Sequence, residues 1–110
     1  MKKGSIVLTA VFILLFASLA AEAGIIRIKN NTGVEIVELY ISDSGTNDWE
    51  EDVLGSDTLS QGETLNLTVN GSYRKFDLRI TDGENALDFF GLDGSATSIV
   101  LNSDGTASYQ

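Results

Sequence analysis

The sequence predicts an all-β fold, a small antiparallel β-sandwich of about seven strands that follows a cleaved N-terminal signal peptide. Two patterns favour this class. Apolar and polar residues alternate with period two in several short segments, as they do on strands with one buried face. Turn-forming Asn-Gly and Asp-Gly pairs begin at Asn70, Asp82, Asp93 and Asp104. Their spacing is close to the roughly 8–12 residues typical of short antiparallel strands.

Residues 1–23 have the three parts of a signal peptide. A positive start at Lys2-Lys3 leads into residues 6–21, which contain no charged side chain, and then into the cleavage pattern Ala21-Glu22-Ala23. A transmembrane anchor is the alternative, but it needs about 20 apolar residues and different flanks. No cysteine follows the apolar run, which excludes a lipid-anchored lipoprotein. We therefore expect cleavage after this pattern, one domain over residues 24–110, no stable membrane anchor, and an extracytoplasmic location, either periplasmic or secreted.

The first segments after the cleavage pattern read as two strands joined by a turn. Residues 24–30 alternate isoleucines with cations, which is typical of a half-buried strand. Residues 30–33, Asn-Asn-Thr-Gly, predict a tight turn because Asn and Gly tolerate left-handed backbone. Residues 34–41 form the second strand. Its apolar pattern changes face between Ile36 and Val37, which predicts a bulge there or burial on both faces.

The later segments repeat this alternation. Further strands are predicted at residues 64–69, 75–81, 86–92, 99–101 and 106–109. Asn70-Gly71, Asp82-Gly83 and Asp104-Gly105 read as hairpin turns between them. Residues 42–56 are irregular, with a single helical turn as an option that Asn47 or Asp48 would cap and Gly55 would end.

The charge balance of the chain limits the classes of molecule that it can bind. Of seven Lys and Arg and sixteen Asp and Glu in the chain, Lys2, Lys3 and Glu22 fall in the signal peptide, which leaves five cations against fifteen carboxylates. Nucleic acid and anionic lipid are bound chiefly through Lys and Arg, so this balance excludes both. An excess of negative charge of this size increases solubility, or indicates a site for a cation or for a basic partner.

The residue types present also argue against catalysis. The chain has no His and no Cys, which excludes Ser-His and Cys-His nucleophile systems and histidine metal sites. Paired carboxylates can hydrolyse glycosides, so a small carboxylate-dependent hydrolase remains as the least favoured alternative function. A domain this small has little room for a substrate cleft, and we expect no enzyme activity and no catalytic residue.

The acidic loop, defined here as residues 43–57, is the densest cluster of oxygen-bearing side chains. Calcium takes six to eight oxygen ligands, and extracellular modules bind it weakly. The candidate ligands are Asp43, Asn47, Asp48, Glu51 and Asp52. Their spacing does not fit the EF-hand loop, and a solvated acidic loop without an ion is the alternative. Calcium is accordingly the one cofactor that the sequence leaves open.

Tyr40 and Trp49 are candidate contacts for a partner protein or a glycan. Exposed aromatic side chains on β folds stack on sugars or anchor protein contacts. Trp49 has a second interpretation, in which its ring seals the core beneath the acidic loop together with Val53 and Leu54, and the pattern favours this seal.

Three motifs resemble those of a group of small exported bacterial β-sandwich domains. They are Asn-Asn-Thr-Gly at residues 30–33, Leu-Tyr-Ile-Ser-Asp-Ser-Gly at 39–45, and Trp49 followed by Asp-Val-Leu-Gly at 52–55, matching the pattern N-N-T-G, L-Y-x-S-x-S-G, W-x-x-D-x-L-G. The likeness continues through Phe76-Asp-Leu-Arg and covers about half of residues 24–110. It implies a small β-sandwich. The group has no assigned activity, so no functional residue carries over.

These observations predict an extracytoplasmic, non-catalytic binding or assembly module. Its ligand, an unknown protein or glycan, and its oligomeric state do not follow from the residues. The alternative is a carbohydrate-binding or adhesion module that calcium stabilises.

Overall fold

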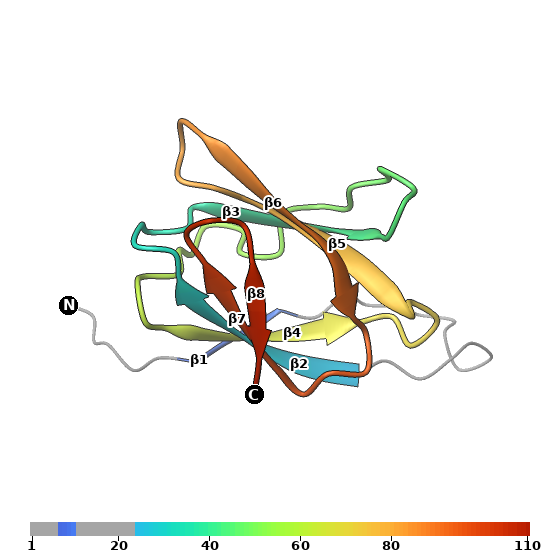
Figure 1. Cartoon of the computed structure of the whole chain (residues 1–110). Helices are drawn as coiled ribbons and strands as arrows, with labels where there is room; N and C mark the ends of the chain where they lie inside the picture. Colours follow the sequence, from blue (N-terminus) through green and yellow to red (C-terminus); the bar gives the residue numbers. More distant parts are fainter. Residues whose placement is uncertain (1–6, 11–23) are drawn as a thin grey trace.

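The computed structural model describes residues 7–10 and 24–110 of the chain. These residues form strands and no helix, which confirms the all-β class (Figure 1). Residues 24–110 contribute seven strands, and two sheets are present. The five-stranded sheet has the order β1 (Val7–Ala10), β4 (Thr64–Val69), β2 (Gly24–Asn31), β7 (Ser98–Asn102) and β8 (Ala107–Tyr109). The three-stranded sheet has the order β3 (Glu38–Asp43), β5 (Lys75–Thr81) and β6 (Ala86–Asp93).

β2 lies inside the five-stranded sheet, and its two neighbouring strands run in opposite directions relative to it. It pairs antiparallel with β4, where Ile26 lies opposite Leu67, and parallel with β7, where Ile28 lies opposite Ile99. The prediction of an antiparallel fold is therefore wrong for the β2–β7 pair. The period-two prediction for β2 is confirmed, because its isoleucines at 26 and 28 are buried and the cations at 27 and 29 are exposed.

β5 is the central strand of the three-stranded sheet and runs antiparallel to both neighbours. Leu78 lies between Ile41 of β3 and Phe89 of β6. Beyond this point the register shifts, and two residues of β6, Phe90 and Gly91, lie opposite the single Asp77 of β5. Such a bulge bends the strand and turns side chains outward. Phe90 is 66% exposed as a result.

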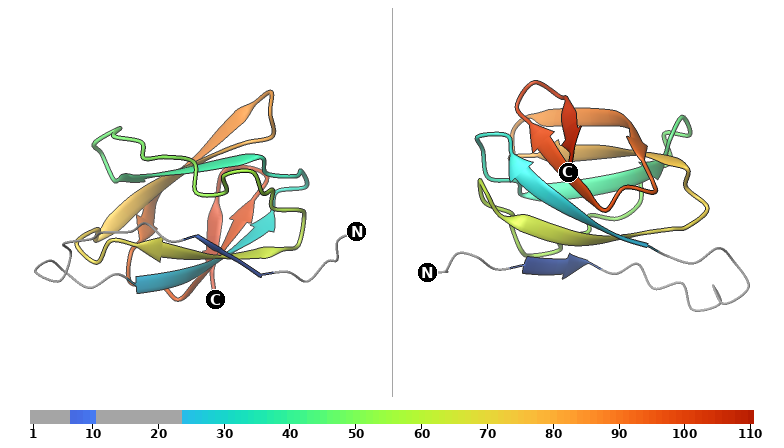
Figure 2. Two further views of the ribbon diagram at one scale, coloured as in Figure 1. Left: turned by 180° about the vertical axis from the view of Figure 1, so that it is seen from behind. Right: turned by 60° about the horizontal axis from the view of Figure 1, so that its bottom comes forward.

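Buried apolar side chains from both sheets form one hydrophobic cluster. Figure 2 shows the two sheets from two further sides. Leu54 and Leu59, which lie between β3 and β4, are buried in the same cluster. The irregular connection that contains the acidic loop is therefore anchored in the core at its C-terminal part.

The Asn-Gly and Asp-Gly turns perform two different tasks. Asp82-Gly83 joins β5 to β6 and Asp104-Gly105 joins β7 to β8, so both close hairpins as predicted. The hairpin predicted at Asn70-Gly71 is wrong, because β4 and β5 belong to different sheets. The Asp93-Gly94 pair likewise connects β6 to β7 across the sheets. Turn chemistry reverses the chain, but the strands' partners decide which sheet it then joins.

Residues 34–41 do not form one continuous strand. Ile36 makes an isolated antiparallel bridge with Leu59, and β3 begins only at Glu38. Between them, Val37 N–H donates to Thr81 C=O at 2.8 Å. The predicted change of face thus marks a change of partner strand rather than a bulge.

The helical turn considered for the acidic loop is absent from the described part of the chain. Residues 53–56 form a turn instead, and Asp57 N–H donates back to Leu54 C=O at 2.9 Å.

The predicted signal peptide lies outside the described residues except for residues 7–10. These four residues are β1, which pairs parallel with β4 at the edge of the five-stranded sheet. Across residues 7–10 and 24–110, there is no helix with the length and apolar character needed to cross a membrane.

Candidate binding surface

The outer face of the three-stranded sheet carries a row of aromatic and charged side chains. Tyr40 of β3, Arg79 of β5 and Asp88 of β6 are successive cross-strand partners, so their side chains leave the sheet on the same side. Trp49 of the acidic loop joins them, because Arg79 Cζ lies 4.6 Å from the centroid of its ring. We call Tyr40, Trp49, Arg79 and Asp88 the arginine row.

Arg79 is held from two sides. Its Nε lies 2.8 Å from Asp88 Oδ1 and its Nη2 lies 2.9 Å from Asp88 Oδ2. Two parallel hydrogen bonds fix the plane of the guanidinium, and the Trp49 ring attracts its charge through the π face. The hydrogen bonds to Asp88 raise the pKa of Arg79, although burial opposes them. Arg79 therefore stays charged in one fixed orientation.

Tyr40 is half-buried next to this ion pair. Burial raises the pKa of its hydroxyl, and the Glu38 carboxylate raises it further. Glu38 is itself oriented, since its Oε1 accepts a hydrogen bond of 2.8 Å from Thr81 Oγ1. The Tyr40 hydroxyl therefore stays neutral at physiological pH.

Trp49 does not seal the core, contrary to the favoured sequence interpretation. It is half-buried, lies outside the hydrophobic cluster and packs on Arg79. Val53 packs against the cluster instead.

The acidic loop runs along the outer edge of β3 and covers it. Glu50 N–H donates to Ile41 C=O at 2.9 Å. Val53 N–H donates to Leu39 C=O at 2.9 Å. Between these two bonds, Asp52 Oδ1 accepts the N–H of Leu39 at 2.8 Å. The same oxygen accepts the N–H of Leu54 at 3.0 Å. Asp52 thus binds the N–H of Leu39 that a neighbouring strand would otherwise bind, and it also closes a turn in the loop through Leu54 N–H.

Asp43 is the last residue of β3, and Asn47 and Asp48 follow the turn at residues 44–45. Thr46 Oγ1 donates to Asp43 C=O at 2.8 Å, and Asp48 N–H donates to Ser42 Oγ at 3.1 Å. Asn47 adopts a φ of 55°, in the left-handed region that Asn tolerates.

The five calcium candidates are not gathered around one point. Asp43 ends β3, and Asn47 and Asp48 follow the turn at residues 44–45. Asp52 covers the edge of β3, and Glu51 is exposed. Within residues 7–10 and 24–110, no three His, Cys, Asp or Glu side chains are grouped to hold a metal ion. The calcium site stays a prediction.

Two further side-chain contacts hold the acidic loop, one to the three-stranded sheet and one to the connection between β4 and β5. The buried Asp77 Oδ1 accepts hydrogen bonds from Ser44 Oγ at 2.9 Å and from Gly91 N–H at 2.8 Å, which joins the loop to the β6 bulge. The Tyr73 hydroxyl donates to Glu50 Oε2. Burial and this bond to Glu50 raise the pKa of Tyr73. Trp49 therefore projects from a segment that is fixed on both sides.

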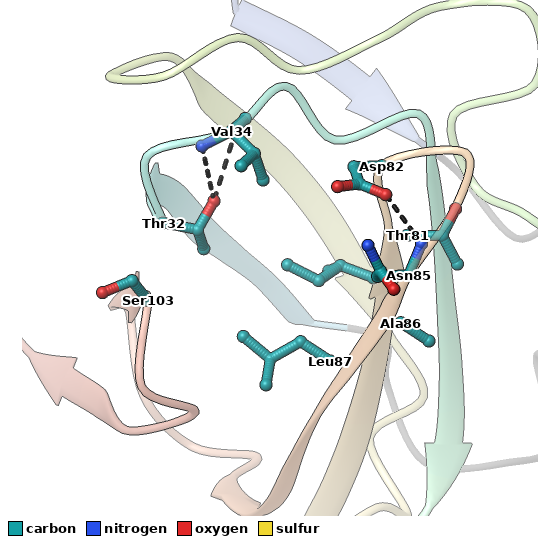
Figure 3. Close-up of a pocket in the computed structure, with 9 residues that line it drawn as sticks. Thr32, Val34, Thr81, Asp82, Asn85, Ala86, Leu87 and Ser103 are labelled. Carbon is teal, nitrogen blue, oxygen red and sulfur yellow. Dashed lines mark hydrogen bonds between the residues drawn. The ribbon is translucent and has the colours of Figure 1, made fainter.

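A separate pocket of about 250 Å³ lies near the turns that follow β2, β5 and β7 (Figure 3). It is lined by Thr32, Val34, Ile80, Thr81, Asp82, Asn85, Ala86, Leu87 and Ser103. Asp82 is engaged in its own turn, where Oδ1 accepts the N–H of Glu84 at 2.9 Å and of Asn85 at 2.8 Å. The volume lies below the roughly 300–1,000 Å³ of ordinary ligand sites, so the pocket admits one side chain or a group of that size.

Comparison of the chain with models of known protein families, with curated proteins and with solved structures finds no match.

Sequence reasoning named Tyr40 and Trp49 but missed the residue that brings them together. Arg79 falls on the polar face of the alternating pattern at residues 75–81, and nothing in that pattern distinguishes it from a solvated cation. Its contacts depend on the cross-strand register with β3 and β6, which a single sequence does not show. Asp77 falls on the same polar face of the pattern, but it is buried at the β6 bulge, where Ser44 contacts it.

Proposed function

We propose that the chain is an exported, non-catalytic binding or assembly module. In this proposal residues 1–23 are removed, residues 24–110 fold as a β-sandwich outside the cytoplasm, and the arginine row is the contact surface. The observation that carries the proposal is the fixed position of Arg79 between Trp49 and Asp88, beside the hydroxyl of Tyr40.

The composition of the arginine row favours a protein partner. Tyr, Trp and Arg dominate the energetics of protein interfaces because each combines a large contact area with a polar group. Ordering a flexible side chain on binding costs roughly 0.5–1.5 kcal/mol. Asp88 and Trp49 already restrain the long side chain of Arg79, so binding would lose less of this entropy.

The chemistry available supports binding rather than turnover. The chain contains no His and no Cys, and the Asp88 carboxylate in the row is already paired with Arg79. Both oxygens of this carboxylate accept hydrogen bonds from the Arg79 guanidinium, so it is not free to act as an acid, a base or a nucleophile.

Site-specific photo-crosslinking in the producing bacterium tests the proposal. A photoreactive phenylalanine analogue replaces Tyr40 in the exported chain, and the crosslinked product is identified by mass spectrometry. We expect one reproducible adduct, and we expect Trp49→Ala in the same chain to reduce its yield several-fold.

The matched control places the same analogue at Ser108, an exposed residue of β8 on the other sheet. Equal adducts from positions 40 and 108 would contradict the proposal, as would a position-40 adduct that Trp49→Ala leaves unchanged. Intact mass of the exported product gives an independent check, with Gly24 as the expected first residue.

A further inference from the structure

β4 is an edge for which residues 24–110 supply only one neighbour. β2 pairs with β4 from Thr64 to Val69 on one side. The other side pairs with β1, four residues of the predicted signal peptide. Cleavage after residue 23 would remove β1 and leave this side of β4 without a partner.

The backbone groups that would be released can be assigned. Asn30 N–H donates to Glu63 C=O at 2.9 Å, just before β4 begins. Bonded and non-bonded residues alternate along an antiparallel pair, so the odd-numbered residues of β4 bond to β2. The even-numbered residues, Thr64, Asn66 and Thr68, therefore turn their N–H and C=O groups toward β1.

The other three sheet edges have features that discourage strand addition. The acidic loop covers β3, the bulge at Phe90 and Gly91 distorts β6, and β8 is only three residues long. β4 has none of these features. Its six residues, Thr-Leu-Asn-Leu-Thr-Val, carry no charge and no proline and keep a regular pairing with β2.

We propose that β4 is an acceptor for an added β-strand. In the processed domain its edge binds an extended, uncharged segment of a partner protein, parallel to β4 and with apolar residues opposite Leu65 and Leu67. This inference rests on the proposed export and cleavage, but it uses a different surface from the arginine row.

The pairing of β1 defines the chemistry of the segment. Val7 to Ala10 run parallel to β4, and Leu8 and Ala10 lie in register with Leu65 and Leu67. Main-chain hydrogen bonds would supply the affinity of such a segment, and the alternate apolar positions would supply its selectivity.

A second copy of the chain fits this edge less well than a foreign segment. Two β4 edges related by a two-fold axis would pair antiparallel, whereas the strand observed on β4 is parallel. Two copies would also each bring five cations against fifteen carboxylates and would repel one another.

The experiment uses the exported protein, with loss of residues 1–23 verified by intact mass. Its probe is a fluorescent peptide with the sequence of residues 5–12, and binding is followed by fluorescence anisotropy. Asn66→Pro removes an edge-facing N–H without breaking the ladder to β2, and Asn66→Ser is the matched control. We expect saturable binding by the wild type and Asn66→Ser, and affinity about tenfold lower or worse for Asn66→Pro.

A scrambled peptide of the same composition should not bind. Absence of binding by the wild type, or equal binding by Asn66→Pro, would overturn the proposal. If Asn66→Pro fails to fold, Thr68→Pro applies the same test at the next edge-facing residue. A wild type that is dimeric while Asn66→Pro is monomeric would overturn the choice of a foreign segment in favour of a second copy.

A disulfide test keeps the strand-acceptor proposal separate from cleavage. The chain contains no native cysteine, so Thr9→Cys with Asn66→Cys can form only one intramolecular disulfide. In chains that retain residues 1–23, we expect this disulfide to form, whereas Thr9→Cys with Ser108→Cys should not. Failure of the 9–66 disulfide would overturn the acceptor role of β4 whatever the fate of the signal peptide.

Discussion

Asn30 is a fully buried polar residue whose side chain joins three segments of the chain. Its Nδ2 donates to Val34 C=O at 2.8 Å and to Leu59 C=O at 2.9 Å. Its Oδ1 accepts from the N–H of Thr32 at 3.0 Å and from the Thr32 hydroxyl at 2.6 Å. A buried amide with every bond made stabilises one arrangement of its surroundings, because any other arrangement would leave polar groups unpaired.

Asn30→Asp is expected to destabilise the domain by about 3 kcal/mol or more near neutral pH. The shape and the acceptor oxygen are kept, but a buried negative charge would face the two carbonyl oxygens that now receive the amide protons. Burial raises the pKa of such a carboxyl above its unfolded value of about 3.9. The loss should therefore shrink as the pH falls toward that value, which urea unfolding at several pH values would measure.

Asn31→Asp is the matched control, since Asn31 is adjacent, of the same type and exposed. A change below about 1 kcal/mol is expected there. Comparable losses for the two variants would show that the burial of Asn30 is not what matters.

At the scale of elements, the acidic loop substitutes for a strand along β3. Two main-chain bonds tie it to β3, and Asp52 accepts the N–H of Leu39 between them. The carboxylate here acts as an acceptor for backbone groups, a role that an amide oxygen can also perform.

Asp52→Ala should therefore lower the free energy of unfolding by about 1–3 kcal/mol, because two partly buried N–H groups lose their acceptor. Asp52→Asn keeps an acceptor oxygen and should cost less than about 1 kcal/mol. Chemical denaturation of the two variants beside Glu51→Ala, an exposed neighbour, measures the difference. Equal losses for Ala and Asn would mean that the charge of Asp52, rather than its hydrogen bonds, stabilises the loop.

Local patterns predicted the strands of this fold better than their pairing. Alternation in β2 and β4 identified which residues face the core, since that depends only on the period of the backbone. Asn70-Gly71 and Asp82-Gly83 have the same turn chemistry, yet only the second closes a hairpin. The difference lies in long-range partners, as it does for the contacts that bring Trp49 to Arg79. The site was therefore predicted as separate residues and not as a surface.

At the scale of the whole molecule, charge is poorly compensated. Residues 24–110 hold fifteen carboxylates and five cations, and within the part of the chain described here only Arg79 and Asp88 form an ion pair. Most carboxylates therefore repel one another across solvent. Salt screens such charges with a length of about 10 Å at 0.1 M.

Sodium chloride is expected to raise the melting temperature of the domain formed by residues 24–110 by several degrees between low and moderate ionic strength. Calcium at matched ionic strength is the comparison, and an equal rise is expected where screening alone acts. Calorimetry in the two salts makes the comparison. A further, saturable rise in calcium would establish the ion site that the sequence predicts in the acidic loop.

The parallel pairing of β2 with β7 also bears on the order in which the domain can fold. β2 begins at residue 24, whereas the Ile99 beside its Ile28 lies near the C-terminus. Contacts between residues so distant in sequence form late, after hairpins such as β5–β6. If the chain is exported from its N-terminus, as proposed, β2 emerges before β7 and cannot form their parallel pairing until β7 follows. A chain interrupted before β7 could not complete the sheet around β2, so under the proposed export this sheet is completed only after β7 has crossed the membrane.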